Sequence, residues 1–200
     1  MFDASTPPAS PRSVAPGTWA AVAGYIGGPT PHIWSAEEWG RFGTAHSGLK
    51  KLPIWVAAPA VHAHAARVGF NVADLPSPAA ADMALSADAE AWTALRRLYA
   101  LGVPKGSPVV WDMETAVAST YLRTVGAVLE WGGYLPWVYG SASTVFDNPP
   151  LHGYWVADYA GKGPFMFDHP EVRATQYASG PAVDSSTVKP WQYEFRMRRW

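Results

Sequence analysis

The most informative part of the sequence is SPVVWDME, residues 107–114, an apolar run that ends in two carboxylates. Short apolar runs of this kind are typical of strands in a parallel sheet that is covered on both faces. Asp112 and Glu114 are two residues apart, so on a strand their side chains emerge on the same side, with backbones about 7 Å apart. The run therefore predicts a buried strand that ends in a pair of acids.

Comparable runs recur along the first two thirds of the chain. Strands are predicted at residues 2–4, 19–26, 52–57 and 134–139. Residues 59–83 are rich in Ala and Pro and are predicted as a long loop. Residues 5–18 are predicted as a Ser/Pro-rich loop. Helical patterns lie in the later intervals, so strands and helices alternate there, which is typical of a parallel sheet.

The predicted helices have recognisable ends. Ser35 begins one helix, because Glu38 three residues later completes a capping box. Ser86 is predicted to cap a second helix, which Gly102 closes, and Gly132-Gly133 closes a third. The second helix is expected to present one face that contains Trp92, Leu95, Leu98 and Tyr99.

The pattern changes after residue 140. Strands are predicted at residues 153–159, 172–177 and 182–184, and the spacers between them contain Pro and Gly instead of a helical stripe. We therefore predict an α/β fold: a TIM-like parallel β/α barrel whose last helices are missing or reduced. Residues 1–188 would form this barrel, and residues 189–200 an appended arm.

Five acids lie at the predicted carboxyl ends of strands: Asp3, Asp112, Glu114, Asp158 and Asp184. These ends converge on one face of a parallel barrel, which is where barrel enzymes place their chemistry. Carboxylates that share a pocket raise one another's proton affinity, which suits a general acid. The alternative is that strand-end Asp residues cap the helices that follow.

Aromatic side chains flank the same strand ends. Trp137 and Tyr139 end one predicted strand, Trp155 and Tyr159 bracket Asp158, and the amide Gln176 lies on a later strand. Flat rings beside carboxylates and amides suit a sugar, which offers C–H faces to stack and hydroxyls to bind. The alternative is a heavily aromatic core, since the chain contains 11 Trp and 9 Tyr.

Composition excludes several other classes. A formal charge of −1 argues against nucleic-acid binding, and no apolar run is long enough for membrane insertion. The absence of cysteine excludes thiolate chemistry, and His62-Ala63-His64 lacks a third metal ligand nearby, so we expect no metal and no cofactor. Met1-Phe2-Asp3 begins neither a basic nor an apolar segment, so we expect no encoded signal peptide.

Several motifs together resemble the family-25 glycoside hydrolases, the muramidases of bacteria and phages. The similar segments are Phe2-Asp3-Ala4-Ser5, Val110-Trp111-Asp112-Met113-Glu114, Tyr139-Gly140, Trp155-Val156-Ala157-Asp158-Tyr159, Ala174-Thr175-Gln176-Tyr177 and Val183-Asp184. The resemblance implies a barrel that cleaves β-1,4-linked peptidoglycan, with Glu114 as the proton donor. Asp112 would then stabilise the developing charge or orient the 2-acetamido group, and Asp3 or Asp184 would position water. Substrate contacts are expected from Tyr25, Trp137, Tyr139, Asp158, Tyr159 and Gln176.

Two stretches depart from this family. Residues 24–28 and 101–108 are closer to the related glycoside-hydrolase-like domain of unknown function found in actinobacteria. The chain also lacks the family-18 chitinase signature before Asp112. Two functions therefore stay open: a muramidase-type glycosidase, or a non-catalytic module of a phage tail, virion or cell wall that retains the barrel. Either would act outside the cell, at the cell wall or in a virion.

The arm, KPWQYEFRMRRW from Lys189 to Trp200, contains four aromatic residues and three arginines. Trp191, Tyr193 and Phe195 alternate with polar residues, as on a half-buried strand. One interpretation is that the arm folds back over the bottom of the barrel. The other is that it docks to a protein partner, since aromatic residues and Arg dominate binding energy at interfaces.

Overall fold

The computed structural model describes residues 2–4, 21–30, 32–44, 50–57, 80–113, 119–148, 151–158, 164, 166–178 and 184–189. Its strands are β1 (Phe2–Ala4), β2 (Ala21–Gly27), β3 (Lys50–Val56), β4 (Pro108–Asp112), β5 (Leu135–Ser141), β6 (Tyr154–Ala157), β7 (Val172–Ala178) and β8 (Asp184–Val188). Its helices are α1 (Ala36–Thr44), α3 (Ala80–Ala100), α4 (Ser119–Trp131) and α5 (Ala142–Phe146).

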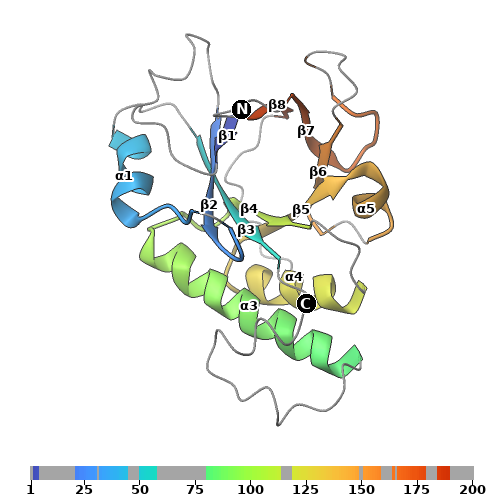
Figure 1. Ribbon diagram of the computed structural model, residues 1–200. Coiled ribbons are helices and arrows are strands. Elements are labelled where there is room, and N and C mark those ends of the chain that lie inside the picture. Colours follow the sequence, from blue (N-terminus) through green and yellow to red (C-terminus); the bar gives the residue numbers. More distant parts are fainter. Residues whose placement is uncertain are drawn as a thin grey trace.

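The fold is mixed α/β, with a mostly parallel curled sheet flanked by helices (Figure 1). Each strand from β1 to β7 pairs in parallel with the next along the chain. β8 pairs with both β7 and β1, so the strand order closes on itself. α3 and α4 lie side by side on the outside of the sheet (Figure 1).

The prediction of a fully parallel barrel is wrong for β8, which runs antiparallel to both neighbours. Only five residues separate Ala178 from Asp184. A parallel connection needs a crossover of about a dozen residues or more, so this short one permits only an antiparallel return. The strand also starts at Asp184 instead of ending there. Its sequence position was mispredicted because Ser185, Ser186 and Thr187 form no apolar run.

The core has two layers. An inner layer fills the ring and consists of Ala21, Ala23, Leu52, Ile54, Val110, Trp137, Trp155 and Ala174. An outer layer lies between the strands and the helices and includes Val22 and Ile26 from β2. Successive residues of a strand point to opposite faces, so each strand contributes to both layers.

The helix ends follow the predicted signals at three places. The Ser35 N–H donates to Glu38 Oε2 at 2.7 Å, and the Glu38 N–H donates to Ser35 Oγ at 3.1 Å, which is the capping box. Gly102 ends α3 with a φ of 63°, and Gly133 follows α4 with a φ of 88°. At each, the next residue donates to the carbonyl five positions earlier, as in a Schellman motif.

The prediction that Ser86 caps α3 is wrong. α3 begins at Ala80, so Ser86 is buried inside it and residues 80–83, predicted as loop, are helical. The first turns are rich in Ala, Met and Leu, which extend a helix well past a candidate cap. The rest of the predicted loop, residues 59–79, lies outside the described residues.

The predicted apolar face of α3 is only partly correct. Leu95 and Leu98 are buried, whereas Trp92 and Tyr99 are 36% and 48% exposed. Ala87, Ala91 and Ala94 complete the buried face instead, because small residues let α3 lie close to the sheet. Among the described helices, none is long and apolar enough to cross a membrane.

Candidate functional site

Asp112 is the last residue of β4 and is 2% exposed. It lies in register between Val56 of β3 and Tyr139 of β5. Its carbonyl accepts from the Ala57 N–H at 2.9 Å, and the Met113 N–H donates to the Tyr139 carbonyl at 2.9 Å. These bonds hold three strand ends level, so the backbone of Asp112 has a fixed position at the rim of the ring.

A small depression surrounds this carboxyl group. Six consecutive strands contribute one side chain each: Tyr25, Ile54, Asp112, Tyr139, Trp155 and Gln176. The lining combines one acid and one amide with three aromatic rings. Parallel strands end at the same face, so the depression lies at the carboxyl ends of the strands, as the sequence predicted for the acids.

A hydrogen bond organises the polar side of the depression. The Tyr139 hydroxyl donates to Gln176 Oε1 at 2.5 Å, and the Gln176 side chain is buried. Because Oε1 accepts this bond, the amide nitrogen of Gln176 keeps two donors for other groups. Among the described residues, the buried indole Nε1 of Trp155 has no hydrogen-bond partner. The lining therefore contains the Gln176 amide and the Asp112 carboxyl group together.

The aromatic rings at the site pack on one another. The Tyr139 and Trp155 rings lie 5.1 Å apart in a T-shaped arrangement. Trp137, predicted to contact substrate, is buried in the inner core layer two residues before Tyr139 on β5. It therefore lies beneath the depression, outside the set of lining residues.

Three of the other predicted acids, Asp3, Asp158 and Asp184, follow the backbone register at this face. Asp3 on β1 is directly opposite Asp184 on β8. Because β8 is antiparallel, its first residue reaches the rim that the other strands reach with their last. Asp158 follows β6, and its N–H donates to the Gln176 carbonyl at 2.9 Å. Glu114 and Tyr159 lie outside the described residues.

Two lining residues were absent from the predicted site. Ile54 lies two positions after Leu52 on β3 and points to the same side, so the period of two along that strand was the available signal. Trp155 was expected near the strand end. It pairs in register with Tyr139 of β5, and alternation along β6 places it on the inner side while Tyr154 belongs to the outer layer.

The loop between β2 and α1 holds the backbone of Tyr25 through Trp34. The Trp34 N–H donates to the Tyr25 carbonyl at 2.8 Å, and the Trp34 ring fills the space beside Gly24, where a Cβ would lie 2.7 Å from it. Arg97 of α3 donates from Nη2 to the Trp34 carbonyl at 2.5 Å. The loop is therefore clamped from both sides.

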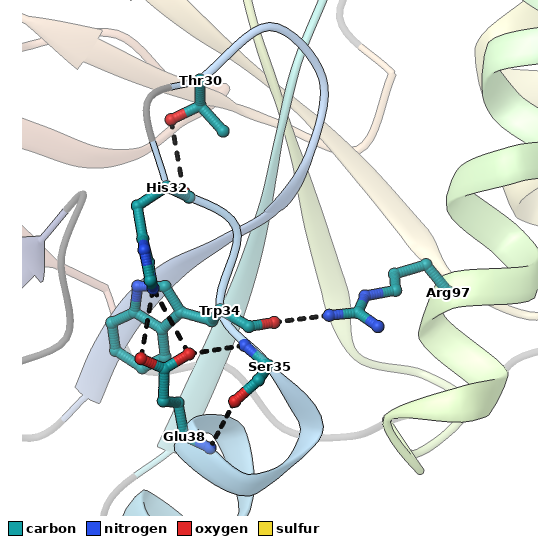
Figure 2. Close-up of polar contacts among 6 residues, drawn as sticks. All are labelled: Thr30, His32, Trp34, Ser35, Glu38 and Arg97. Atoms are coloured by element: carbon teal, nitrogen blue, oxygen red, sulfur yellow. Dashed lines mark hydrogen bonds and ion pairs between the residues drawn. The ribbon is translucent and has the colours of Figure 1, made fainter. Parts of the chain in front are cut away.

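An ion pair completes this loop. His32 Nε2 lies 3.1 Å from Glu38 Oε1, and the same carboxylate accepts from the Ser35 N–H (Figure 2). The backbone hydrogen bond from Ser35 is the main reason that the pKa of Glu38 falls below its ordinary value, with His32 adding to the effect. The charged form of Glu38 thus holds the start of α1.

Metal-ligating groups do not cluster in the described part of the chain, where no three His, Asp or Glu residues are placed to hold an ion. His62 and His64 lie outside that part. The oxygen and nitrogen groups of the depression instead suit a neutral polar ligand with apolar faces.

The chain matches no protein-family model and no curated protein. Its structure is nevertheless similar to solved ones. The Tat-secreted protein Rv2525c of Mycobacterium tuberculosis, in complex with L-tartrate, is 13% identical with a TM-score of 0.62, and the similarity covers 95% of each chain. A family 25 glycosyl hydrolase from Bacillus anthracis is 13% identical with a TM-score of 0.53, covering 88% of this chain and 81% of that one.

A third similar structure is the modular autolysin LytC of Streptococcus pneumoniae in complex with a synthetic peptidoglycan ligand. It is 12% identical with a TM-score of 0.54, covering 84% of this chain and 40% of LytC. The chain shares the fold of these proteins. At such identities the likeness concerns the fold alone, and it agrees with the expected resemblance to family-25 glycoside hydrolases at that level.

Proposed function

We propose that this protein binds glycan strands of peptidoglycan at the carboxyl ends of its strands and hydrolyses a β-1,4 linkage there. The observation that carries the proposal is the buried Asp112 carboxyl group inside a ring of aromatic and amide side chains. A buried acid costs free energy unless its surroundings compensate, so an acid retained at this place is a candidate for function.

The lining has the chemistry of a sugar site. Tyr25 and Tyr139 supply apolar ring surface for the C–H faces of a pyranose ring, and the buried Trp155 ring supports Tyr139 from below. The Gln176 amide supplies donors, while Asp112 supplies an acceptor.

Hydrolysis needs an acid and a partner carboxylate. Glu114, two residues beyond Asp112, would protonate the leaving oxygen, and Asp112 would stabilise the oxocarbenium-like transition state. Asp3 and Asp184, opposite each other in the register of β1 and β8, would position the attacking water. The oxygen of that water bonds to the anomeric carbon while one of its protons passes to Asp3 or Asp184. The glycosidic C–O bond breaks, and Glu114 gives its proton to the leaving oxygen. Return of a proton from the aspartic acid to Glu114 through solvent restores both groups.

The fold of the similar proteins supports the same proposal. LytC was solved with a peptidoglycan ligand, and the Bacillus anthracis protein is a glycosyl hydrolase. We therefore propose that the protein acts at the cell wall, outside the cell. The alternative function is a module that binds wall glycan without cleaving it. Measuring binding and cleavage together distinguishes this alternative from hydrolysis.

The test measures both binding and cleavage of purified peptidoglycan by the full chain. We expect release of new reducing ends, complete loss of that release in Glu114→Gln, and a smaller loss in Asp112→Asn. Glu171→Gln is the control, because Glu171 precedes β7 at the opposite end of the ring. Binding without cleavage would overturn hydrolysis and support the binding module. Absence of both would overturn the proposal.

A further inference from the structure

Three exposed rings lie together on the outer surface of α3 and α4: Trp92, Tyr99 and Trp131, here named the aromatic patch. Trp92 is 36% exposed, Tyr99 48% and Trp131 71%. The Trp92 and Trp131 rings are 5.0 Å apart in a T-shaped arrangement, and the Tyr99 hydroxyl donates to the Gly132 carbonyl at 3.4 Å. Contiguous exposed apolar surface of this kind marks an interaction site.

The aromatic patch lies near the end of the ring opposite the depression. It occupies the second half of α3 and the last turn of α4, and the chain enters β4 and β5 directly after these helices. The turns that follow the two helices are joined, since the Gly106 N–H donates to the Gly133 carbonyl at 2.7 Å. The patch is therefore separate from the proposed glycan site.

β8 delivers the rest of the chain to this same end. Because β8 is antiparallel, its last residues lie beside the first residues of β7: Val188 is opposite Ala174, and the Lys189 N–H donates to the Arg173 carbonyl at 2.8 Å. Eleven residues follow Lys189. An extended segment of that length reaches about 36 Å. β8 and β5 are three strand spacings apart, or about 15 Å, and a helix layer adds about 10 Å.

We propose that residues 190–200 of the same chain cover the aromatic patch. The segment contains Trp191, Tyr193 and Phe195 at alternate positions, and these rings can pack on the exposed indoles. Arg196, Arg198 and Arg199 can stack on ring faces or approach Glu130, which precedes Trp131 and has a half-buried side chain. The apolar character of the segment thus matches the surface.

Tethering favours this occupant over a second copy of the chain. A segment joined by a short linker has an effective concentration in the millimolar range at sites that it can reach. A free second copy at micromolar concentration competes poorly with it. The proposal is independent of the glycan site, because it involves neither Asp112 nor any lining residue.

The first test is a double-mutant cycle that compares stabilities toward unfolding. The measured quantity is the midpoint of urea denaturation. We expect deletion of residues 190–200 and Trp131→Ser each to lower the midpoint. In the Trp131→Ser background the deletion should lower it far less, because the segment has then lost its main contact. Ile33→Ser is the control: Ile33 is 45% exposed on the loop after β2, so its effect and that of the deletion should add. Additive effects of the deletion and Trp131→Ser would overturn the proposal.

The second test uses the absence of native cysteine. Ala127 lies one turn before Trp131 on the exposed side of α4. We expect Ala127→Cys combined with Phe195→Cys to form an intramolecular disulfide on mild oxidation, and Glu37→Cys combined with Phe195→Cys to form none. A disulfide between two molecules would assign the patch to a second copy and overturn the proposal. Equal yields for the two pairs, including no disulfide in either, would overturn it as well.

Discussion

At the scale of single residues, Gln176 shows how the ring accommodates a polar group. Its side chain is buried among rings, where an amide without partners costs free energy. The Tyr139 hydroxyl satisfies Oε1 from a strand two positions away in the sheet order. The pair therefore serves stability and the shape of the depression at once.

Tyr139→Phe should lower the free energy of unfolding by about 1–3 kcal/mol, because it leaves a buried Gln176 oxygen without its donor. The same change should weaken binding of peptidoglycan fragments, since the amide is then free to rotate. Urea denaturation and fragment titration measure the two effects. Tyr99→Phe is the matched control: its hydroxyl bond is long, at 3.4 Å, and belongs to a half-exposed side chain, so a change below about 0.5 kcal/mol is expected.

At the scale of elements, features that depend on a few neighbouring residues were predicted correctly from the sequence. Features that depend on contacts between distant parts of the chain were not. The capping box at Ser35 and Glu38 and the glycine ends at Gly102 and Gly133 are decided within a few residues, and the structure confirms them. The predicted start of α3 was wrong. Ser86 has a side chain that often caps helices, but here it lies inside a helix that residues of high helix propensity extend to Ala80. The direction of β8 depends on the length of a connection and on its two neighbours.

The same division holds at the candidate site. The strand that ends in Asp112 was predictable from its apolar run, and so was the face on which it lies. Which residues meet around Asp112 depends on inward-facing positions on six strands, and hence on register. Ile54 was missed for that reason, while Trp137 lies beneath the lining instead of within it.

Gly102→Ala tests the end of α3. Gly102 has a φ of 63°, and an added Cβ would meet no atom within 4 Å, so only backbone strain opposes the change. We expect a loss of about 1–2 kcal/mol in the free energy of unfolding. Gly40→Ala inside α1 also has open space, and there a gain of about 0.5–1 kcal/mol is expected. Equal effects of the two substitutions in urea denaturation would contradict the assigned conformations.

The start of α1 should be sensitive to acid. The pKa of Glu38 is lowered in the folded protein, so the charged form stabilises the fold at pH values above the ordinary 4.5, and this contribution disappears as the pH falls through the lower folded value. Glu38→Gln should therefore flatten the loss of stability below pH 4.5, as measured by denaturation at a series of pH values. Glu37→Gln, one position earlier, is the control and should leave that slope steeper than Glu38→Gln does.

At the scale of the whole molecule, closure depends on the antiparallel β8. Phe2 and Ser185 are directly opposite across the β1–β8 pair, and opposed residues of antiparallel strands have Cα atoms about 4.5–5.5 Å apart. Phe2→Cys combined with Ser185→Cys should therefore form a disulfide. Because it closes a long loop in the unfolded chain, it should stabilise the fold by about 4–5 kcal/mol. Gel mobility without reductant and the melting temperature measure the result.

The control for this disulfide moves one partner along β8. Thr187 is two residues beyond Ser185, which takes its Cα past the roughly 7 Å limit for a disulfide with position 2. Phe2→Cys combined with Thr187→Cys should stay reduced under the same conditions. Similar yields from the two pairs would mean that the ring does not close in this register.

The position of β8 also affects when the sheet can close during synthesis of the chain. β1 leaves the ribosome first and β8 last, yet the two are neighbours in the finished ring. Until β8 emerges, β1 has one unpaired edge, and such an edge is a template for strands of other molecules. Contacts between residues far apart in the sequence also form slowly. Translation therefore keeps this edge open longest, and a chaperone that binds extended backbone would be most useful there.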